Sequence, residues 1–107
     1  MSEITLPKTI ADYFATSGNR DALDLFATGA TVIDEGHTHV GIEAISAWLV
    51  SVEQRYKPRY VLMEATNEDN RHVVTFEVSG TFPGSPAILQ QAFELGESDT
   101  IEHLQTL

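Results

Sequence analysis

Two stretches of the chain have apolar side chains every three or four residues, which is the spacing of an amphipathic helix. The first takes up about the first fifteen residues, and its apolar face carries Leu6, Ile10, Tyr13 and Phe14. The second is stronger: it begins after Gly41 and ends before Pro58, because proline cannot continue a helix. Its apolar face carries Ile42, Ile45, Trp48 or Leu49, Val52 and Tyr56.

A less regular segment separates these two helices. Ser17-Gly18-Asn19 is a polar break, after which the sequence predicts a short helix over residues 22–26 with Gly29 as its C-terminal stop. The β-branched run 31–33 then predicts a short strand that ends in Asp34-Glu35-Gly36. We therefore expect three helical segments and one strand in the first half of the chain.

The pattern changes after Pro58, where apolar and polar residues alternate as they do in a half-buried strand. In the clearest example, Val74, Phe76 and Val78 alternate with Thr75, Glu77 and Ser79. The four predicted strands cover residues 59–65, 71–81, 87–95 and 100–107. Because the helices come first and an antiparallel meander follows, we predict an α+β fold in a single domain, 1–107.

Composition and charge exclude several function classes. The 107 residues carry sixteen Asp and Glu against six Lys and Arg, a formal net charge of −10. The chain therefore lacks the cations with which a nucleic-acid binder or a polybasic membrane-surface module contacts phosphate. It has no cysteine, which excludes disulfides, thiolate metal ligands and a cysteine nucleophile. No apolar run reaches the length of a membrane helix and no signal-peptide pattern is present, so we expect a cytoplasmic protein.

Five segments, taken in order, resemble one protein family over essentially the whole chain. They are 22–27 (ALDLFA), 30–36 (ATVIDEG), 41–48 (GIEAISAW), 80–86 (GTFPGSP) and the ending 93–104. Their order and spacing are similar to the SnoaL-like branch of the nuclear-transport-factor-2-like superfamily, which includes ketosteroid isomerase and polyketide cyclases. The resemblance implies a cone-shaped fold, with N-terminal helices packed on a curved, mostly antiparallel β-sheet. It also implies homodimers, for which the sheet face with Thr75, Glu77 and Ser79 is a suitable surface.

The resemblance further implies that Asp34 is a general base facing the interior of the cone. Desolvation in an apolar pocket makes a carboxylate a stronger base, which it must be to accept a proton from carbon. Tyr13 takes the place of the phenolic hydrogen-bond donor of ketosteroid isomerase-like relatives. The second donor in that mechanism is a protonated acid, but alignment on Phe93 puts Leu89 there, with Gln91 two residues on and pointing the same way. We therefore do not expect steroid isomerisation by that route.

His37-Thr38-His39 is the second candidate for chemistry, because alternate residues of an extended segment lie on one face. Two imidazoles with Asp34 or Glu35 match the ligands of a His₂-carboxylate metal site. Alternatively, one histidine pairs with a carboxylate as a base, or the segment is a solvated loop before the helix. His39 is closer to Gly41, where the helix begins, and we take it as the histidine of the pocket. We expect no metal and no cofactor.

Aromatic side chains are the expected apolar walls of the pocket, and for each of them the alternative is the hydrophobic core. Trp48 lies on the apolar stripe of the long helix, and its indole N–H needs a partner if it is buried. Phe82 begins the rigid segment 82–86, whose two prolines and one glycine interrupt the sheet at the rim of the cone. The predicted ligand-binding residues are Phe14, Trp48, Phe76, Phe82, Gln91 and Phe93.

These features together predict a pocket for a small, hydrophobic, neutral carbonyl compound, since a chain of charge −10 disfavours anionic ligands. One hypothesis is a cofactor-free isomerase, cyclase or dehydratase, with Asp34 as base and His39 and Tyr13 as proton donors or orienters. The other is a non-catalytic member of the same fold that binds a small ligand or serves as a dimeric module, which Leu89 favours.

Overall fold

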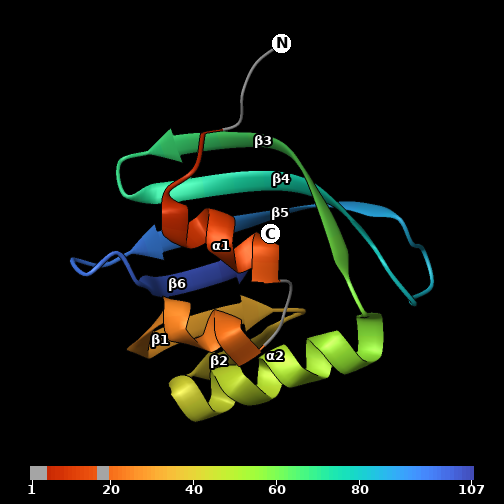
Figure 1. Ribbon diagram of the computed structural model, residues 1–107, viewed down its shortest axis with the longest axis horizontal. Coiled ribbons are helices and arrows are strands. Elements are labelled where there is room, and N and C mark those ends of the chain that lie inside the picture. Colours follow the sequence, from red (N-terminus) through yellow and green to blue (C-terminus); the bar gives the residue numbers. More distant parts are fainter. Residues whose placement is uncertain (1–4, 17–19) are drawn as a thin grey trace.

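The computed structural model describes residues 5–16 and 20–107, and the break predicted at residues 17–19 lies outside them. Within the described residues, Figure 1 shows two α-helices and a short 3₁₀ helix packed against a curved sheet. In chain order the elements are α1 (Lys8–Thr16), η1 (Arg20–Leu25), β1 (Phe26–Asp34), β2 (His37–Val40), α2 (Ile42–Tyr56), β3 (Arg59–Glu68), β4 (Arg71–Ser79), β5 (Ala87–Leu95) and β6 (Ile101–Thr106). Neither of these α-helices has the length and apolarity that crossing a bilayer requires.

The strands form one sheet in the order β2-β1-β6-β5-β4-β3. Strands β3 to β6 are an antiparallel meander, which β1 joins by pairing parallel to β6, with β2 antiparallel to β1. The register of β3 on β4 shifts between Leu62 and Glu64, and a bulge of this kind bends a strand and increases its twist. In Figure 1, β3 and β4 bend toward the C-terminal end of α2. The predicted α+β cone with a curved, mostly antiparallel sheet is confirmed.

Aromatic rings fill the space between α1 and the concave face of the sheet. Tyr13 and Phe14 of α1 are buried, and their ring centroids lie 5.4 and 5.6 Å from that of Phe93 on β5. The Phe76 ring of β4 is 5.1 Å from Phe14. Burying a side chain of this size contributes roughly 1.5–3 kcal/mol to the free energy of unfolding. The rings that helical spacing places on one face therefore hold α1 on the sheet.

The C-terminal end of α2 is attached to the end of β4. Lys57 adopts a left-handed conformation with φ 44°, and its N–H donates to the Glu53 carbonyl oxygen, which ends the helix. The Tyr56 carbonyl oxygen accepts a hydrogen bond from the Thr81 N–H at 2.8 Å. Gly80 lies so close to this carbonyl oxygen that a Cβ atom there would overlap with it. The approach of the helix to the sheet thus depends on a residue without a side chain.

Two parts of the first half differ from the sequence prediction. The short helix is a 3₁₀ helix that ends at Leu25, and Gly29 does not stop a helix, because it lies inside β1. Residues 37–40 form strand β2 rather than a solvated loop, since they pair with β1 from Thr31 opposite Val40 to Asp34 opposite His37. Pairing with β6, from the other end of the chain, gives β1 a tertiary context that local propensity does not contain.

We predict that Gly80→Ala lowers the free energy of unfolding by about 3 kcal/mol, because the new methyl group overlaps with backbone that cannot move without displacing α2. Gly29→Ala is the matched control: a Cβ there meets open space, and alanine in a strand is about 0.5 kcal/mol better than glycine. Urea unfolding followed by circular dichroism measures both. Equal stability of the two variants would contradict this description of the α2–β4 junction.

Candidate functional site

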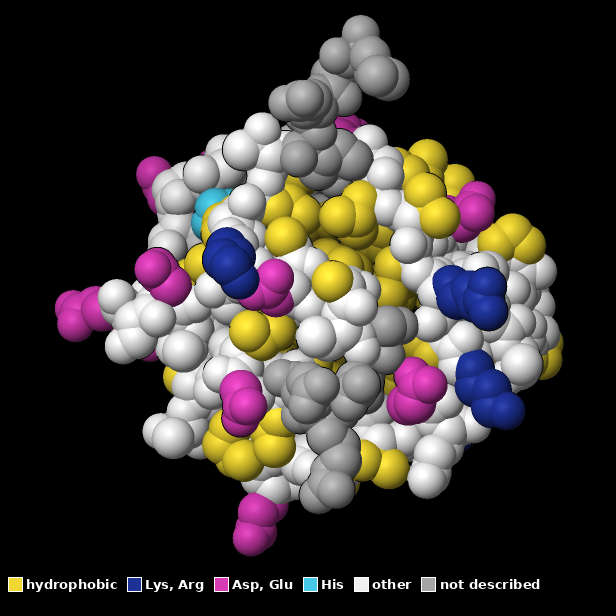
Figure 2. Space-filling model, in the orientation of Figure 1, with side chains coloured by type: hydrophobic (Ala, Val, Ile, Leu, Met, Phe, Trp, Pro, Cys, Tyr) yellow, Lys and Arg dark blue, Asp and Glu magenta, His cyan; other side chains and the backbone are white. Residues whose placement is uncertain are grey.

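A cavity of about 130 Å³ lies between α1, α2 and the concave face of the sheet. Figure 2 shows hydrophobic side chains on the floor of a hollow between α1 and the bend of β3. The apolar part of the lining comes from Val52, Phe76, Val78, Phe82 and Leu89. A mostly apolar cavity with a few polar groups is typical of a site for a small organic ligand.

Asp34 supplies a carboxylate to this cavity. It is the last residue of β1 and is half-buried. The Trp48 indole N–H donates a hydrogen bond to Asp34 Oδ2 at 3.0 Å, and Trp48 itself is 7% exposed. A buried indole needs an acceptor, and the carboxylate provides it. Because a carboxylate has two oxygens and several lone pairs, this bond orients Asp34 without using up its capacity to accept a proton.

A second polar group lies on the sheet, where Gln91 of β5 is opposite Thr106 of β6. Gln91 Nε2 donates to Thr106 Oγ1 at 3.0 Å. Gln91 is buried, and its Oε1 atom has no hydrogen-bond partner among the described residues. Burial raises the pKa of Tyr13 well above its usual range, and Tyr60 and Asp34 add to the effect. The Tyr13 phenol therefore stays protonated and able to donate.

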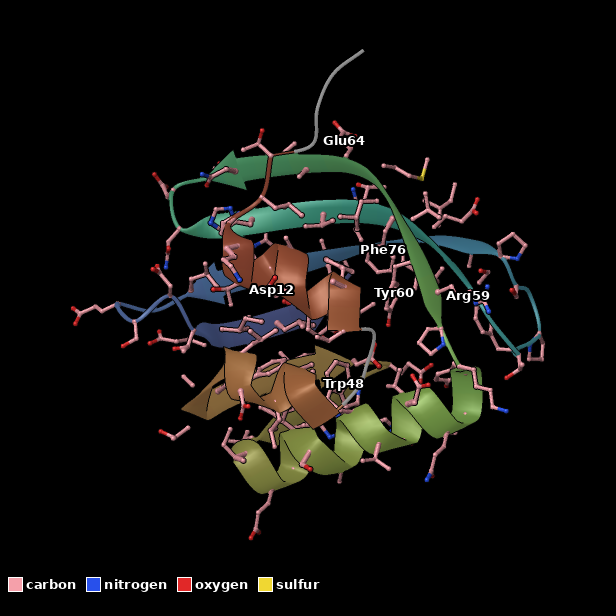
Figure 3. All side chains as sticks on the ribbon, viewed as in Figure 1. Asp12, Trp48, Arg59, Tyr60, Glu64 and Phe76 are labelled. Atoms are coloured by element: carbon pink, nitrogen blue, oxygen red, sulfur yellow. The ribbon has the colours of Figure 1, made fainter. Side chains whose placement is uncertain are left out.

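Tyr60, near the start of β3, is a second phenol in the lining. Burial raises the pKa of Tyr60 to about 12, and the negative charges of Asp34 and Glu53 add to this shift. Its ring packs against Phe76 with the centroids 5.4 Å apart. Figure 3 shows Tyr60 and Phe76 extending from the strands toward the region above Trp48. Tyr60 thus combines an apolar contact with a hydroxyl that is protonated at neutral pH.

Tyr56 and Glu35 line the cavity next to Asp34. The Tyr56 hydroxyl donates to Glu35 Oε1 at 3.0 Å, which links the last turn of α2 to the turn between β1 and β2. Burial, together with this hydrogen bond, raises the pKa of Tyr56. The Arg55 guanidinium lies 5.1 Å from the centroid of the same ring. These contacts fix the position of the Tyr56 ring at the edge of the cavity.

His39 lies outside this cavity, in a neighbouring one of about 200 Å³. Asp34, Glu35 and Trp48 line both cavities and so stand between them. The ring of half-buried His39 is 6.1 Å from that of Trp48, whereas His37 is exposed. Among the residues that the structure describes, no group of three or more His, Asp and Glu side chains is arranged to hold a metal ion.

The structure brings six of the nine residues predicted for the site together at the first cavity: Tyr13, Asp34, Trp48, Phe76, Phe82 and Gln91. Phe14 and Phe93 do not line it. They are buried behind Tyr13 and Phe76 in the hydrophobic core. His39 lines only the second cavity, which Asp34 also lines, and its ring lies 6.1 Å from that of Trp48.

Sequence reasoning misses three residues of the polar part of the cavity, Tyr56, Tyr60 and Thr106. Tyr60 alternates with Leu62 on β3, and this period of two could have marked it as facing inward. Thr106 meets Gln91 only because β6 pairs with β5 in this register. No local pattern predicts such a register, since the partner strand determines it.

This arrangement can move a proton. A carboxylate accepts protons, and protonated phenols in the same apolar cavity can donate hydrogen bonds to an oxygen that becomes negative. The two functions come from different elements, Asp34 from β1 and Tyr13 from α1, so a ligand lying between them can contact both.

A scan against protein-family models and a search of the curated proteins found no match. Among solved structures, a candidate polyketide cyclase from Sinorhizobium meliloti is 31% identical in sequence, with 95% of each chain covered and a TM-score of 0.90. A candidate isomerase of the SnoaL-like family from Agrobacterium tumefaciens is 16% identical over 92% of this chain and 93% of that chain, with a TM-score of 0.74. SalBIII, an epoxide hydrolase/cyclase-like enzyme in pyran ring formation in polyether salinomycin, is 15% identical over 94% of this chain and 87% of that chain, with a TM-score of 0.79. The first is similar in sequence and in fold, and the other two in fold alone.

We predict that the protein loses stability above pH 10 and that Tyr60→Phe reduces this loss. The pKa of Tyr60 is about 12 in the folded state and about 10 in the unfolded state, so between these values only the unfolded chain releases the proton. The free energy of unfolding therefore falls as the pH rises, by about 1.4 kcal/mol at pH 11 from Tyr60 alone. Urea unfolding at pH 9 and pH 11 measures the difference.

The control for Tyr60→Phe is the wild type at pH 9, where the tyrosine is neutral in both states and contributes no pH dependence. A Tyr60→Phe protein with the same decrease between pH 9 and pH 11 as the wild type would contradict the burial of this hydroxyl.

Proposed function

This chain belongs to the SnoaL-like and nuclear-transport-factor-2-like superfamily, and from that premise we propose that its cavity binds a small, neutral carbonyl compound whose α-carbon is deprotonated by Asp34. The protein would then be a cofactor-free isomerase or cyclase. The solved structure with 31% sequence identity is a candidate polyketide cyclase, and this supports a reaction of the same general kind.

The observation that carries the proposal is a carboxylate held by Trp48 at the wall of an apolar cavity. In the proposed step, Asp34 takes a proton from the carbon next to the carbonyl, the C–H electron pair forms a C=C bond, and the carbonyl oxygen becomes an enolate oxygen. The Tyr13 hydroxyl donates a hydrogen bond to that oxygen, where the new charge is greatest. Asp34 then returns the proton to a different carbon of an enolate that is conjugated with a C=C bond. Alternatively, the enolate attacks a second carbonyl to close a ring, and the alkoxide oxygen formed there takes the proton from Asp34. Neither outcome requires an oxidant or a reductant.

Cavity size and charge limit the ligand. An apolar cavity of about 150 Å³ holds one benzene ring, so a space of about 130 Å³ accepts roughly one six-membered ring. Larger compounds would have to extend through the hollow seen in Figure 2. The net charge of −10 and the nearby carboxylates Asp34 and Glu35 disfavour an anionic group at this place.

Leu89 favours a second candidate function, ligand binding without turnover. This residue lines the cavity at the position where the resemblance to ketosteroid isomerase places a protonated acid. Leucine cannot donate a hydrogen bond, so an enolate oxygen there would have one donor fewer. With a weaker oxyanion site, the same cavity would serve for binding or transport of a small hydrophobic compound.

We also propose that two copies of the chain associate through the convex face of the sheet. Val61 on β3 and Ile88 on β5 are 60% and 61% exposed, and both are paired with Glu77 of β4 in the registers of the sheet. Exposed apolar side chains grouped on one face are typical of an interaction surface. A second copy of the chain packed on this face would cover Val61 and Ile88.

The proposed reaction predicts that the wild-type protein accelerates exchange of the α-protons of cyclohexanone with D₂O, and that Asp34→Asn slows this exchange roughly 10³-fold. The variant removes the base, but its amide oxygen still accepts the Trp48 hydrogen bond, so the fold is kept. Loss of the α-proton signals in ¹H NMR spectra measures the rate.

Asp24→Asn, an identical change at an exposed position in η1, is the control and is expected to leave the rate unchanged. A wild-type rate equal to that of buffer, with cyclohexanone bound, would favour the binding function. A full rate in Asp34→Asn would exclude Asp34 as the base.

For the dimer, we predict that Ile88→Asp converts the protein to monomers, because two buried, unpaired carboxylates would face each other across the interface. Val40→Asp is the control, since Val40 is equally exposed, at 62%, but lies on β2 at the other edge of the sheet. Size-exclusion chromatography with light scattering gives the mass. A monomeric wild type would contradict the proposal.

A further inference from the structure

Gln91 has a hydrogen-bonding requirement that the described protein does not meet. The residue is only 7% exposed, and its amide nitrogen is directed to Thr106 Oγ1 at 3.0 Å. The amide oxygen, Oε1, is buried with no partner among the described residues. A buried acceptor without a donor is destabilising, and buried polar groups of this kind are rare in folded proteins. Because Gln91 lines the cavity, a bound molecule can supply the missing donor.

We propose that the ligand is a neutral hydroxyketone, whose hydroxyl group donates to Gln91 Oε1 while its carbonyl oxygen accepts from Tyr13. This inference rests on the proposed function, since it assigns a substrate class to the same cavity. It adds a second polar contact that resemblance to known folds does not supply. Leu89, two residues away on the same face of β5, provides an apolar neighbour to the amide.

The orientation of the amide follows from its partners. Nε2 is the end that donates to Thr106 Oγ1, whereas Oε1 has no partner among the described residues. Oε1 is therefore the end of the amide that remains for a ligand. The Tyr13 hydroxyl lines the same cavity and has a hydrogen to donate. The cavity thus offers one donor and one acceptor, and they match a molecule with one acceptor and one donor.

A ligand that fills a space of about 130 Å³ beside Gln91 must supply a donor to Oε1 or leave this acceptor unpaired. The apolar lining favours a neutral hydroxyl over a charged ammonium group, because burying a charge in such surroundings is costly. The cavity therefore selects for a hydroxyl group in addition to accepting a ketone.

The same contact limits the reaction. A hydroxyl group leaves carbon as water only if it receives a proton, whereas Oε1 can only accept one. The hydroxyl that donates to Gln91 is therefore an anchor that stays on the product. Of the reactions considered for this cavity, isomerisation and ring closure are compatible with this role, and dehydration at that hydroxyl is not.

The test compares two ring compounds of equal heavy-atom count, 4-hydroxycyclohexanone and 1,4-cyclohexanedione. The second has a carbonyl acceptor in place of the hydroxyl donor. Binding is followed by NMR through the indole N–H signal of Trp48, the one tryptophan of the sequence, which lines the cavity. We expect the wild type to bind the hydroxyketone about tenfold more tightly than the dione, as a hydrogen bond to a buried acceptor requires.

Gln91→Met removes the amide at similar side-chain length and is expected to bring the affinity ratio to about one. Gln90→Met is the matched control, because Gln90 is exposed on the other face of β5, where it donates to Thr75 Oγ1. This variant is expected to keep the tenfold ratio. Circular dichroism shows whether each variant is folded.

The wild-type ratio decides the question even if Gln91→Met does not fold. Equal or weaker binding of the hydroxyketone by the wild type overturns the inference, as does a tenfold ratio that persists in folded Gln91→Met. In those cases the proposed ketone site still stands. If neither compound binds to the wild type, the proposed function itself fails, and this inference fails with it.

Discussion

The hydrogen bond from the Trp48 indole to the Asp34 carboxylate joins the two elements that form one wall of the cavity. Asp34 ends β1, and Trp48 lies in the second turn of α2, fourteen residues later. If this contact were absent, a buried indole N–H would lack an acceptor and the carboxylate would lack a fixed direction. The same hydrogen bond therefore fixes both the path of α2 across the sheet and the position of the proposed base.

The bend of the sheet provides the cavity into which the Asp34 carboxylate extends. The bulge between Leu62 and Glu64 bends β3, and β4 is attached to the C-terminal end of α2 through the Thr81–Tyr56 hydrogen bond. The cavity lies on the concave side of this curved sheet. The lining of this cavity is mostly apolar, with a few polar side chains that donate or accept hydrogen bonds. Its small volume and the net charge of −10 act together to favour a small neutral ligand.

The sequence predicts those features that depend on local patterns. Helix α2 ends where Pro58 requires it to end, and Val74, Phe76 and Val78 face the core as their alternation indicates. Strand β2 and the true length of β1 depend on pairing with distant residues, and local patterns do not reveal such pairing. The same reason applies to the site. The indole N–H of Trp48 visibly needs a partner, but only the fold identifies Asp34 as that partner, and only the register of β5 on β6 brings Gln91 to Thr106.

The proposed function requires a ketone to lie between the Asp34 carboxylate and the Tyr13 hydroxyl. The most direct measurement is a crystal structure of the protein with 4-hydroxycyclohexanone bound. Our account predicts density for the ring in the cavity beside Phe76, with the ketone oxygen within 3 Å or so of the Tyr13 hydroxyl, as a hydrogen bond requires, and the adjacent carbon facing Asp34. A ring bound elsewhere on the molecule, or a cavity that holds only water at saturating ligand, would contradict it.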